Sequence, residues 1–268
     1  MTNPYFAANN IGMTDHRFSR IERMIGVDGL RRLAGSRVAV IGLGAVGSYA
    51  VEGLARAGVG YLRLVDFDRI RPSNINRQLY ALESTVGEAK STVARRRVLD
   101  INPACVVEAV DCFVHAETMD AALAGPIDLM VDAIDSLAPK VELLAAARIR
   151  GLPLISSMGA ALRTDPGLVR VGPLSEVHHC PLAAKVRKRL RLRGIDTELL
   201  CVYSTEPVEW LRKEVIGTEE QARDELVVRG RARRVLGSLP TLTGIFGLTA
   251  ANAAIKILLN EYFPTNKQ

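Results

Sequence analysis

Three glycines at Gly42, Gly44 and Gly47 follow an apolar segment and constrain the fold more than any other feature of the chain. The apolar segment predicts a strand over 37–42, and the segment after it predicts a helix over 45–58. Glycines at a strand-to-helix turn let the backbone approach a phosphate, and the N–H groups at the helix N-terminus attract its charge. The pattern therefore favours a nucleotide-binding turn over a tight turn that binds nothing.

Strand-like and helix-like patterns alternate through the rest of the first half of the chain. Apolar segments predict further strands at 61–65, 106–110, 127–131 and 154–156. Amphipathic segments predict helices at 16–34, 87–100 and 136–150. Strands joined by helices of crossover length form parallel sheets with helices on both faces. We therefore expect an α/β fold with a Rossmann-like, mostly parallel sheet.

The second half is less regular and follows without a linker. Its patterns predict short strands at 168–171 and 200–203, and helices at 181–193 and 241–260. The polar and charged segment 204–238 is not assigned to an element. We expect a flexible arm over 1–15 and one domain over 16–264, with a nucleotide-binding half at 16–160 and a substrate and dimerisation half at 161–264.

Composition excludes several classes of protein. Hydrophobic residues make up 48% and charged residues 24%, which permits a sizeable core and argues against global disorder. The four cysteines form no C-x-x-C pair, so we expect no disulfide framework or structural zinc site and a reducing, cytoplasmic compartment. The polar N-terminus has no secretory pattern. The apolar stretch 239–259 contains polar residues and favours a buried helix over a membrane span.

Acidic residues follow the second predicted strand. Asp66 lies nineteen residues after Gly47 and ends that strand, where a carboxylate accepts hydrogen bonds from ribose hydroxyls. This role suits NAD and ATP equally, so Asp66 indicates that a ribose is bound but does not indicate which reaction takes place. We expect Asp68, in the same loop, to contribute to the nucleotide site.

Polar and cationic residues further along this loop distinguish an ATP site from an NAD site. A cation at the phosphates neutralises the charge that develops as pyrophosphate leaves. Arginine makes bidentate phosphate contacts, and lysine acts as a point charge. A lone cation is usually a solvated surface residue, but Arg77 and Lys90 both follow a nucleotide turn, beside Asn74 and Gln78. We expect both cations to contact phosphates and not to pack, which favours ATP over a hydride-transfer cofactor.

Two aspartates follow the strand predicted at 127–131. Asp132 and Asp135 would lie at the carboxyl edge of the sheet, where open α/β sheets bind ligands. A carboxylate there can hold Mg²⁺ on a triphosphate. Asp135 could instead cap the helix that begins at Ser136. We favour Asp135 as a magnesium ligand.

The cysteines leave two readings open. Cys201 could accept an acyl group from an adenylate as a thioester. It could equally be a small apolar core residue. The run His178, His179 and Cys180 is not expected to bind a metal, because adjacent residues seldom coordinate one ion together.

Basic residues gather in the second half of a chain with net charge +6. One cluster comprises Lys185, Arg187, Lys188, Arg189, Arg191 and Arg193. A second comprises Arg229, Arg231, Arg233 and Arg234. Such runs are usually solvated faces, but two of them in the half that would select the substrate make nucleic-acid binding an equal alternative.

The nucleotide-site motifs together resemble the adenylate-forming superfamily of ubiquitin-activating-like enzymes, the MoeB/ThiF/HesA type. The matching segments are Gly42 to Gly47, Asp66 to Asp68, Ser73 to Gln78, Lys90 and Asp132 to Ser136. The resemblance implies a ribose contact for Asp66 and a magnesium contact for Asp135. It implies phosphate contacts for Asn74, Arg77 and Lys90, supported by Gln78.

Within this superfamily the chain is most similar to the branch that dehydrates threonylcarbamoyladenosine in tRNA. The similarity includes Arg17-Phe18 and segments 86–90, 101–103, 181–185 and 201–206. It implies a homodimer that uses ATP and Mg²⁺ to form an acyl adenylate, which closes to the cyclic product. It also implies an arginine finger that one subunit supplies to the other across the dimer interface, and Arg20 and Arg23 are the candidates. Sulfur-relay proteins are possible partners.

Three other functions remain as alternatives. An adenylyltransferase for a small sulfur-carrier protein would share the ATP pocket, but the missing C-x-x-C pairs and the basic clusters argue against it. A nicotinamide dehydrogenase would use only the glycine turn and Asp66. A non-catalytic tRNA-binding protein is disfavoured because the ATP-site positions are all present.

Overall fold

The computed structural model describes residues 16–208 and 236–260. The expected arm over 1–15, the second basic cluster and the last residues of the expected domain lie outside the described residues.

Seven strands form one sheet within the described part of the chain. They are β1 (Arg37–Ile41), β2 (Tyr61–Val65), β3 (Val106–Val110), β4 (Leu129–Asp132), β5 (Leu154–Ser157), β6 (Val169–Pro173) and β7 (Leu200–Ser204). Their order is β3-β2-β1-β4-β5-β7-β6, and every neighbouring pair is parallel except β6 and β7. The chain therefore reverses its winding direction between β1 and β4, where sheets of this kind bind ligands.

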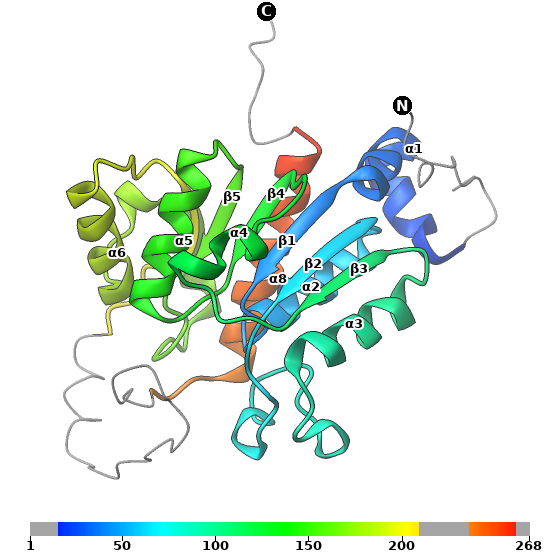
Figure 1. Ribbon diagram of the computed structural model, residues 1–268, viewed down its shortest axis with the longest axis horizontal. Helices are drawn as coiled ribbons and strands as arrows, with labels where there is room; N and C mark the ends of the chain where they lie inside the picture. Colours follow the sequence, from blue (N-terminus) through cyan, green and yellow to red (C-terminus); the bar gives the residue numbers. More distant parts are fainter. Residues whose placement is uncertain (1–15, 209–235, 261–268) are drawn as a thin grey trace, which may run out of the picture.

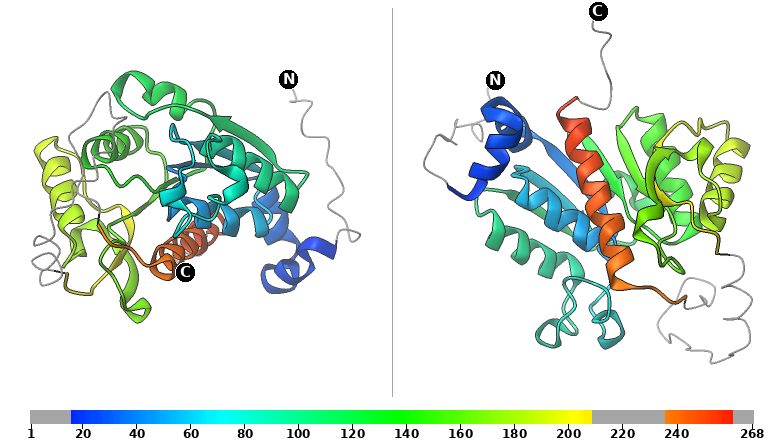
Figure 2. Two further views of the ribbon diagram at one scale, coloured as in Figure 1. Left: turned by 90° about the horizontal axis from the view of Figure 1, so that it is seen from below. Right: turned by 180° about the vertical axis from the view of Figure 1, so that it is seen from behind.

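Helices cover both faces of the sheet, as predicted (Figures 1 and 2). One face packs against α2 (Gly47–Arg56), α3 (Lys90–Ile101) and α8 (Pro240–Leu258). The other packs against α4 (Met119–Ala122), α5 (Leu137–Ile149) and α6 (Pro181–Leu192). The helix α1 (Ser19–Gly35) precedes β1 and is kinked at Gly26, whose φ is 75°. Because both faces are covered, the central strands are buried on both sides, and their sequences are continuous apolar runs.

The two halves of the sequence share this one sheet. β7 and β6 extend it beyond β5, so the less regular second half continues the first. The apolar C-terminal helix is long and apolar enough to cross a membrane by length and composition alone. In the structure it packs across α2 and the sheet, which agrees with the prediction of a buried helix.

The sequence placed the start of the third helix too early. It predicted a helix from Gly87, but α3 begins at Lys90. Gly87 has a φ of 89°, which does not belong to a helix, and Ala89 forms an isolated antiparallel bridge with Arg69. The residues just before α3 therefore pair with residues near the start of the loop that joins β2 to α3. The short α4 was not predicted, because four residues give too short a pattern.

The carboxyl ends of the parallel strands meet at one edge of the sheet. The long loop between β2 and α3 forms the cyan and teal turns at the foot of Figure 1. The glycine turn after β1 and the loop after β4 lie at the same edge, because β1 is paired in parallel with both β2 and β4. This edge therefore gathers the residues that the sequence predicts to bind a nucleotide.

Close packing of α2 against α8 fixes the helix that carries the glycine turn. A Cβ at Gly247 would overlap the carbonyl oxygen of Val46 and lie 2.7 Å from Cβ of Tyr49. A Cβ at Gly53 would lie 2.8 Å from Cβ of Ala251. Glycine is therefore required at these two positions because the helix backbones approach each other too closely for a side chain.

We predict that Gly247→Ala lowers the free energy of unfolding by about 1–3 kcal/mol, because the methyl group forces α8 away from α2. Gly35→Ala, at the end of α1, is the matched control, since a Cβ there meets nothing within 4 Å. Urea unfolding of both variants tests the prediction. Equal stability of the two variants would contradict the close approach of the helices.

Candidate active site

The glycine turn has a backbone that other residues could not adopt without strain. Gly42 has a φ of 90°, and a Cβ there would lie 3.0 Å from the backbone of Ala133. A Cβ at Gly47 would overlap the carbonyl oxygen of Gly42. The turn therefore lies directly against the loop after β4, and its glycines are needed for that contact as well as for an approaching phosphate.

Asp66 holds the glycine turn in place. Its Oδ2 accepts a hydrogen bond from the backbone N–H of Leu43 (2.6 Å), and its Oδ1 accepts one from Asp68 (2.8 Å). Burial raises the pKa of Asp66, while the ammonium of Lys90 and these two hydrogen bonds oppose the rise. The sequence predicted a ribose contact for Asp66 and gave no sign of this structural role. A carboxylate oxygen can accept a second hydrogen bond, so the two roles are compatible.

Lys90 is buried, and the expectation that it does not pack is wrong. Only 4% of the residue is exposed, and its Nζ lies 2.8 Å from Oδ2 of Asp68. Its backbone N–H also donates to the carbonyl of Asp68 (3.0 Å). As the first residue of α3, Lys90 joins that helix to the end of β2. Its ammonium is therefore held beside Asp66 and Asp68, at the carboxyl edge of the sheet.

The segment that contains Arg77 contacts the first turn of α2. Gln78 is buried, and its Nε2 lies 3.8 Å from the position that a Cβ on Gly44 would take. The backbone N–H of Leu79 donates to Oγ of Ser48 (3.2 Å). Arg77 itself is half-buried, and its Nη1 donates to the carbonyl of Ser73 (3.0 Å). The structure therefore brings this segment to the glycine turn, as the nucleotide hypothesis requires.

Asn74 has a local role as well. Its Oδ1 accepts a hydrogen bond from the backbone N–H of Arg71 (3.1 Å), at a short 3₁₀ helix over Pro72–Asn74. The side chain thus shapes the turn that leads to Arg77. The sequence did not predict this contact, although asparagine commonly bonds to nearby backbone in turns.

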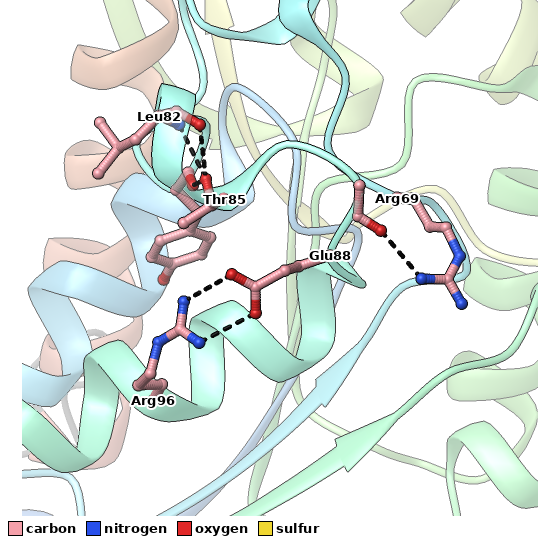
Figure 3. Close-up of polar contacts among 7 residues, drawn as sticks. Arg69, Leu82, Thr85, Glu88 and Arg96 are labelled. Atoms are coloured by element: carbon pink, nitrogen blue, oxygen red, sulfur yellow. Dashed lines mark hydrogen bonds and ion pairs between the residues drawn. The ribbon is translucent and has the colours of Figure 1, made fainter.

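Further contacts fasten the outer turns of this loop (Figure 3). Oγ1 of Thr85 accepts a hydrogen bond from the backbone N–H of Leu82 (2.9 Å). Arg96 of α3 forms two hydrogen bonds with Glu88 (2.9 and 3.0 Å). The loop is therefore ordered by its own contacts and by α3, and its cations are positioned in advance of a ligand.

A buried ion pair supports the loop after β4. Asp132 and Lys140 are both fully buried, and Nζ of Lys140 lies 2.5 Å from Oδ2 of Asp132. Oγ of Ser156 in β5 donates to the same oxygen (2.6 Å), and the backbone N–H of Ile134 donates to Oδ1 (3.0 Å). This network joins β4, α5 and β5. The sequence did not predict a buried role for Lys140.

Asp135 is exposed at this edge and does not cap α5. The N-cap residue is Ser136, so the alternative reading of Asp135 as the cap is wrong. In the described residues no group of three or more His, Cys, Asp or Glu side chains could hold a metal on its own. Mg²⁺ bound to a triphosphate needs only one or two carboxylates, because the phosphates and water supply the other ligands. Of the two carboxylates at the end of β4 and just after it, Asp132 is paired with Lys140 and Asp135 is exposed.

Cys201 lies in the core of the sheet. It is fully buried in β7, and its thiol hydrogen faces the carbonyl of Leu199 (3.7 Å). Burial raises the pKa of the thiol, which keeps it neutral and unreactive. These features agree with the reading of Cys201 as an apolar core residue. They do not suit a nucleophile.

The other predicted site residues lie apart from this edge. Arg20 and Arg23 are exposed on α1, which lies on the far side of the molecule from the loop carrying Arg77 and Lys90 (Figures 1 and 2). The structure therefore does not bring either arginine to the site of its own chain.

The basic helix α6 has an apolar face and a cationic face. Ala183, Val186 and Leu190 are buried, and α6 packs against α5. Nη1 of Arg187 donates to two backbone carbonyls, those of Leu174 and Val177 (2.9 and 2.8 Å). The remaining five cations of the cluster are exposed.

Known proteins resemble this chain over most of its length. The ThiF family model matches residues 18–268. The tRNA threonylcarbamoyladenosine dehydratase of Bacillus subtilis (strain 168) is 39% identical over 246 residues, which cover 92% of this chain and 96% of that protein. The crystal structure of Escherichia coli tRNA N6-threonylcarbamoyladenosine dehydratase, TcdA, in complex with ATP is similar with a TM-score of 0.79 and 32% identity. That match covers 93% of this chain and 96% of the other.

A second kind of relative matches less of the chain. The molybdopterin-synthase adenylyltransferase of Escherichia coli (strain K12) is 36% identical over 158 residues, which cover 57% of this chain and 62% of that protein.

We predict that Lys140→Met lowers the free energy of unfolding by about 3–5 kcal/mol, because it leaves the Asp132 carboxylate buried without its partner. The double variant Asp132→Asn with Lys140→Met removes both charges and should recover most of this loss. Urea unfolding of the two variants measures the difference. A single variant at least as stable as the double variant would show that the pair is not a buried ion pair.

Proposed function

The chain belongs to the ThiF family, and from that membership we propose that it activates a carboxylate by transferring AMP to it from ATP. We further propose that this carboxylate belongs to the threonylcarbamoyl group on a tRNA adenosine, and that the product is its cyclic, dehydrated form. The observation that carries the proposal is that Asp66 and Gln78 contact one glycine turn, with Lys90 beside Asp66 and Arg77 next to Gln78 in the chain. An N–H-lined turn with two cations suits a triphosphate whose α-phosphorus is attacked.

In the proposed reaction a carboxylate oxygen attacks the α-phosphorus of ATP, and pyrophosphate leaves with the electrons of the broken P–O bond. The activated carbonyl is then attacked within the same side chain, the ring closes and AMP leaves. The net change in the nucleoside is the loss of one water. Arg77 and Lys90 would stabilise the charge on the phosphates, and Asp66 would bind the ribose.

Asp135 would hold a magnesium ion on the triphosphate. When bound there, the ion would neutralise charge on the departing pyrophosphate. Asp135 is exposed beyond β4, one strand away from the glycine turn, which supports this role.

We also propose that the protein works as a homodimer in the cytoplasm. Arg20 and Arg23 cannot serve as a finger in their own chain from their place on α1, and a second copy could bring one of them to the site. The described cysteines are all free, which fits a reducing compartment.

The main alternative is an adenylyltransferase for a small sulfur-carrier protein. It would need the same nucleotide site, so that site does not separate the two functions. The exposed cations of α6 favour tRNA, since a polyanion releases counterions on binding them. The wider match to the tRNA enzymes, over 92% of the chain against 57%, supports the same choice.

The direct experiment is incubation of the protein with ATP and tRNA that contains threonylcarbamoyladenosine, followed by mass spectrometry of the nucleosides. We expect conversion to a nucleoside lighter by the mass of one water, with one AMP formed per conversion. Pyrophosphate exchange that requires a carrier protein and ignores tRNA would favour the alternative.

We predict that Arg77→Ala and Lys90→Met each lower the rate of tRNA-dependent AMP formation roughly 10²–10³-fold, because each removes a charge contact to the transition state. Methionine is chosen at position 90 because the hydrocarbon stem of Lys90 is buried and its replacement must fill the same space. Arg95→Ala is the control, since it removes an exposed cation from the same helix. Turnover near the parent level in both test variants would reject the assigned pocket.

We predict that replacing Lys188, Arg189 and Arg191 by alanine weakens binding to different tRNAs by a similar factor. It should flatten the plot of log affinity against log salt by up to about three units, one for each lost phosphate contact. The control replaces three exposed cations on α1 and α2, Arg31, Arg32 and Arg56. If both triple variants behave alike in a salt titration, α6 is only a solvated face.

A further inference from the structure

Arg163, in the loop after β5, is buried with unused hydrogen-bond donors. Only 1% of the residue is exposed, and its Nη2 donates to the carbonyl of His179 (2.7 Å). Its Nε and Nη1 are the buried side-chain nitrogens without a partner among the residues that the structure describes. A buried donor without an acceptor loses its bonds to water and gains none in return. The fold alone therefore does not account for this arginine.

The nearest carboxylate does not bond to Arg163. Glu206 influences the guanidinium only through its charge, because its oxygens accept from Thr164 N–H (2.9 Å), Thr164 Oγ1 (2.7 Å) and Asp165 N–H (3.1 Å). Burial lowers the pKa of Arg163, while the charges of Cys180 and Glu206 and a side-chain hydrogen bond with Cys180 oppose this effect. These contacts still leave Nε and Nη1 without an acceptor.

Arg63 shows how the same fold treats an arginine with a structural role. It is similarly buried, with 7% of the residue exposed. Its Nε donates to Glu108 (2.6 Å), and its Nη1 donates to the carbonyls of Ala121 and Ala124. Because this arginine is fully paired and Arg163 is not, the unused donors of Arg163 indicate a missing acceptor.

The surroundings of Arg163 favour an anion. Cys180 is the N-cap of α6, a helix of 12 residues, and its Sγ accepts from the N–H of Ala183 (3.5 Å). The guanidinium is bonded to the residue before that cap, so it lies beside the positive end of the helix dipole. The residues on either side of the contact, Leu162 and His179, have φ values of 61° and 53°, a left-handed conformation rare outside glycine.

The position of this loop matches the side from which an acyl substrate must approach. β5 is the parallel neighbour of β4, so the loop after it lies at the same edge as Asp135. Asp66, the residue proposed to bind the ribose, follows β2 on the other side of β1. The nucleotide would occupy the β1 and β2 side of the edge, which leaves the β5 and β7 side to the second substrate.

We propose that Arg163 is a substrate-binding residue that donates hydrogen bonds to the carboxylate of the threonylcarbamoyl group and holds it for attack on the α-phosphorus. The proposal rests on the proposed function. In this proposal the buried guanidinium becomes accessible when the substrate binds, and Nε and Nη1 then gain the acceptor that they lack.

The test compares Arg163→Met with the parent and with Arg63→Met. Arg163→Met should unfold at nearly the same urea concentration as the parent, because it removes only the hydrogen bonds to His179 and Cys180. Arg63→Met should be less stable, because Glu108 loses its partner. In turnover of tRNA that contains threonylcarbamoyladenosine, Arg163→Met should raise KM about 10- to 100-fold, the loss of hydrogen bonds to a charged group. Its affinity for ATP should not change.

Binding measurements identify the group that Arg163 holds. The affinity of Arg163→Met should fall for tRNA that carries the threonylcarbamoyl group and stay at the parent level for the unmodified transcript. An equal fall for both RNAs would mean that Arg163 binds a phosphate, and parent-like KM and affinity would mean that it binds nothing; either result overturns the proposal. If Arg163→Met does not fold, Arg163→Lys serves in its place, with a smaller rise in KM for the same RNA.

A small probe separates this inference from the proposed function. N-carbamoylthreonine carries the same carboxylate and should bind the parent, but not Arg163→Met, in a calorimetric titration. A parent that binds the probe yet converts no tRNA rejects the proposed function and keeps the carboxylate site. A parent that converts tRNA while both proteins bind the probe equally rejects the carboxylate site and keeps the function.

Discussion

The two hydrogen bonds accepted by the Asp66 carboxylate connect most of the nucleotide edge. One oxygen binds the backbone of the glycine turn, and the other binds the backbone at the start of the loop after β2. Lys90 then joins this loop to α3 through Asp68. The turn that would meet a phosphate and the loop that would supply its cations are therefore positioned by one side chain. Loss of that carboxylate would release both at once.

A second network of polar contacts positions the loop after β4. The buried pair of Asp132 and Lys140, with Ser156, joins β4 and β5 to α5. Asp135 lies three residues beyond Asp132, so its place at the edge depends on this pair. The contribution of this pair to stability differs from that of the Asp66 hydrogen bonds. A fully buried ion pair adds little over apolar residues, yet removing one partner is costly, so the pair fixes the geometry of the loop more than it adds stability.

The side of the edge that we propose binds the substrate is built from the less regular half of the chain. The loop after β5 carries Arg163, and α6 begins beside it and presents cations along its outer face. An RNA that follows these cations would reach the edge near the helix N-terminus. In the comparisons, the match to a tRNA enzyme covers 92% of the chain and the match to an adenylyltransferase covers 57%. In the proposed function, nucleotide binding and substrate selection use different parts of one sheet.

The sequence by itself determined the alternation of strands and helices, the parallel sheet and the place of the glycine turn. These depend on local requirements, which are the periodicity of the apolar residues and the positive φ that the turn requires at Gly42. It also identified Asp66 and Asp135 as carboxylates that follow strands, and Arg77 and Lys90 as cations in the segment after Asp66. Only the tertiary structure decided that Lys90 is buried against Asp68, that Lys140 pairs with Asp132 and that Arg163 has unused donors. It also decided that Cys201 is closed to solvent. The pairing and burial of a polar group depend on which distant segments pack around it, and no local pattern in the sequence carries that information.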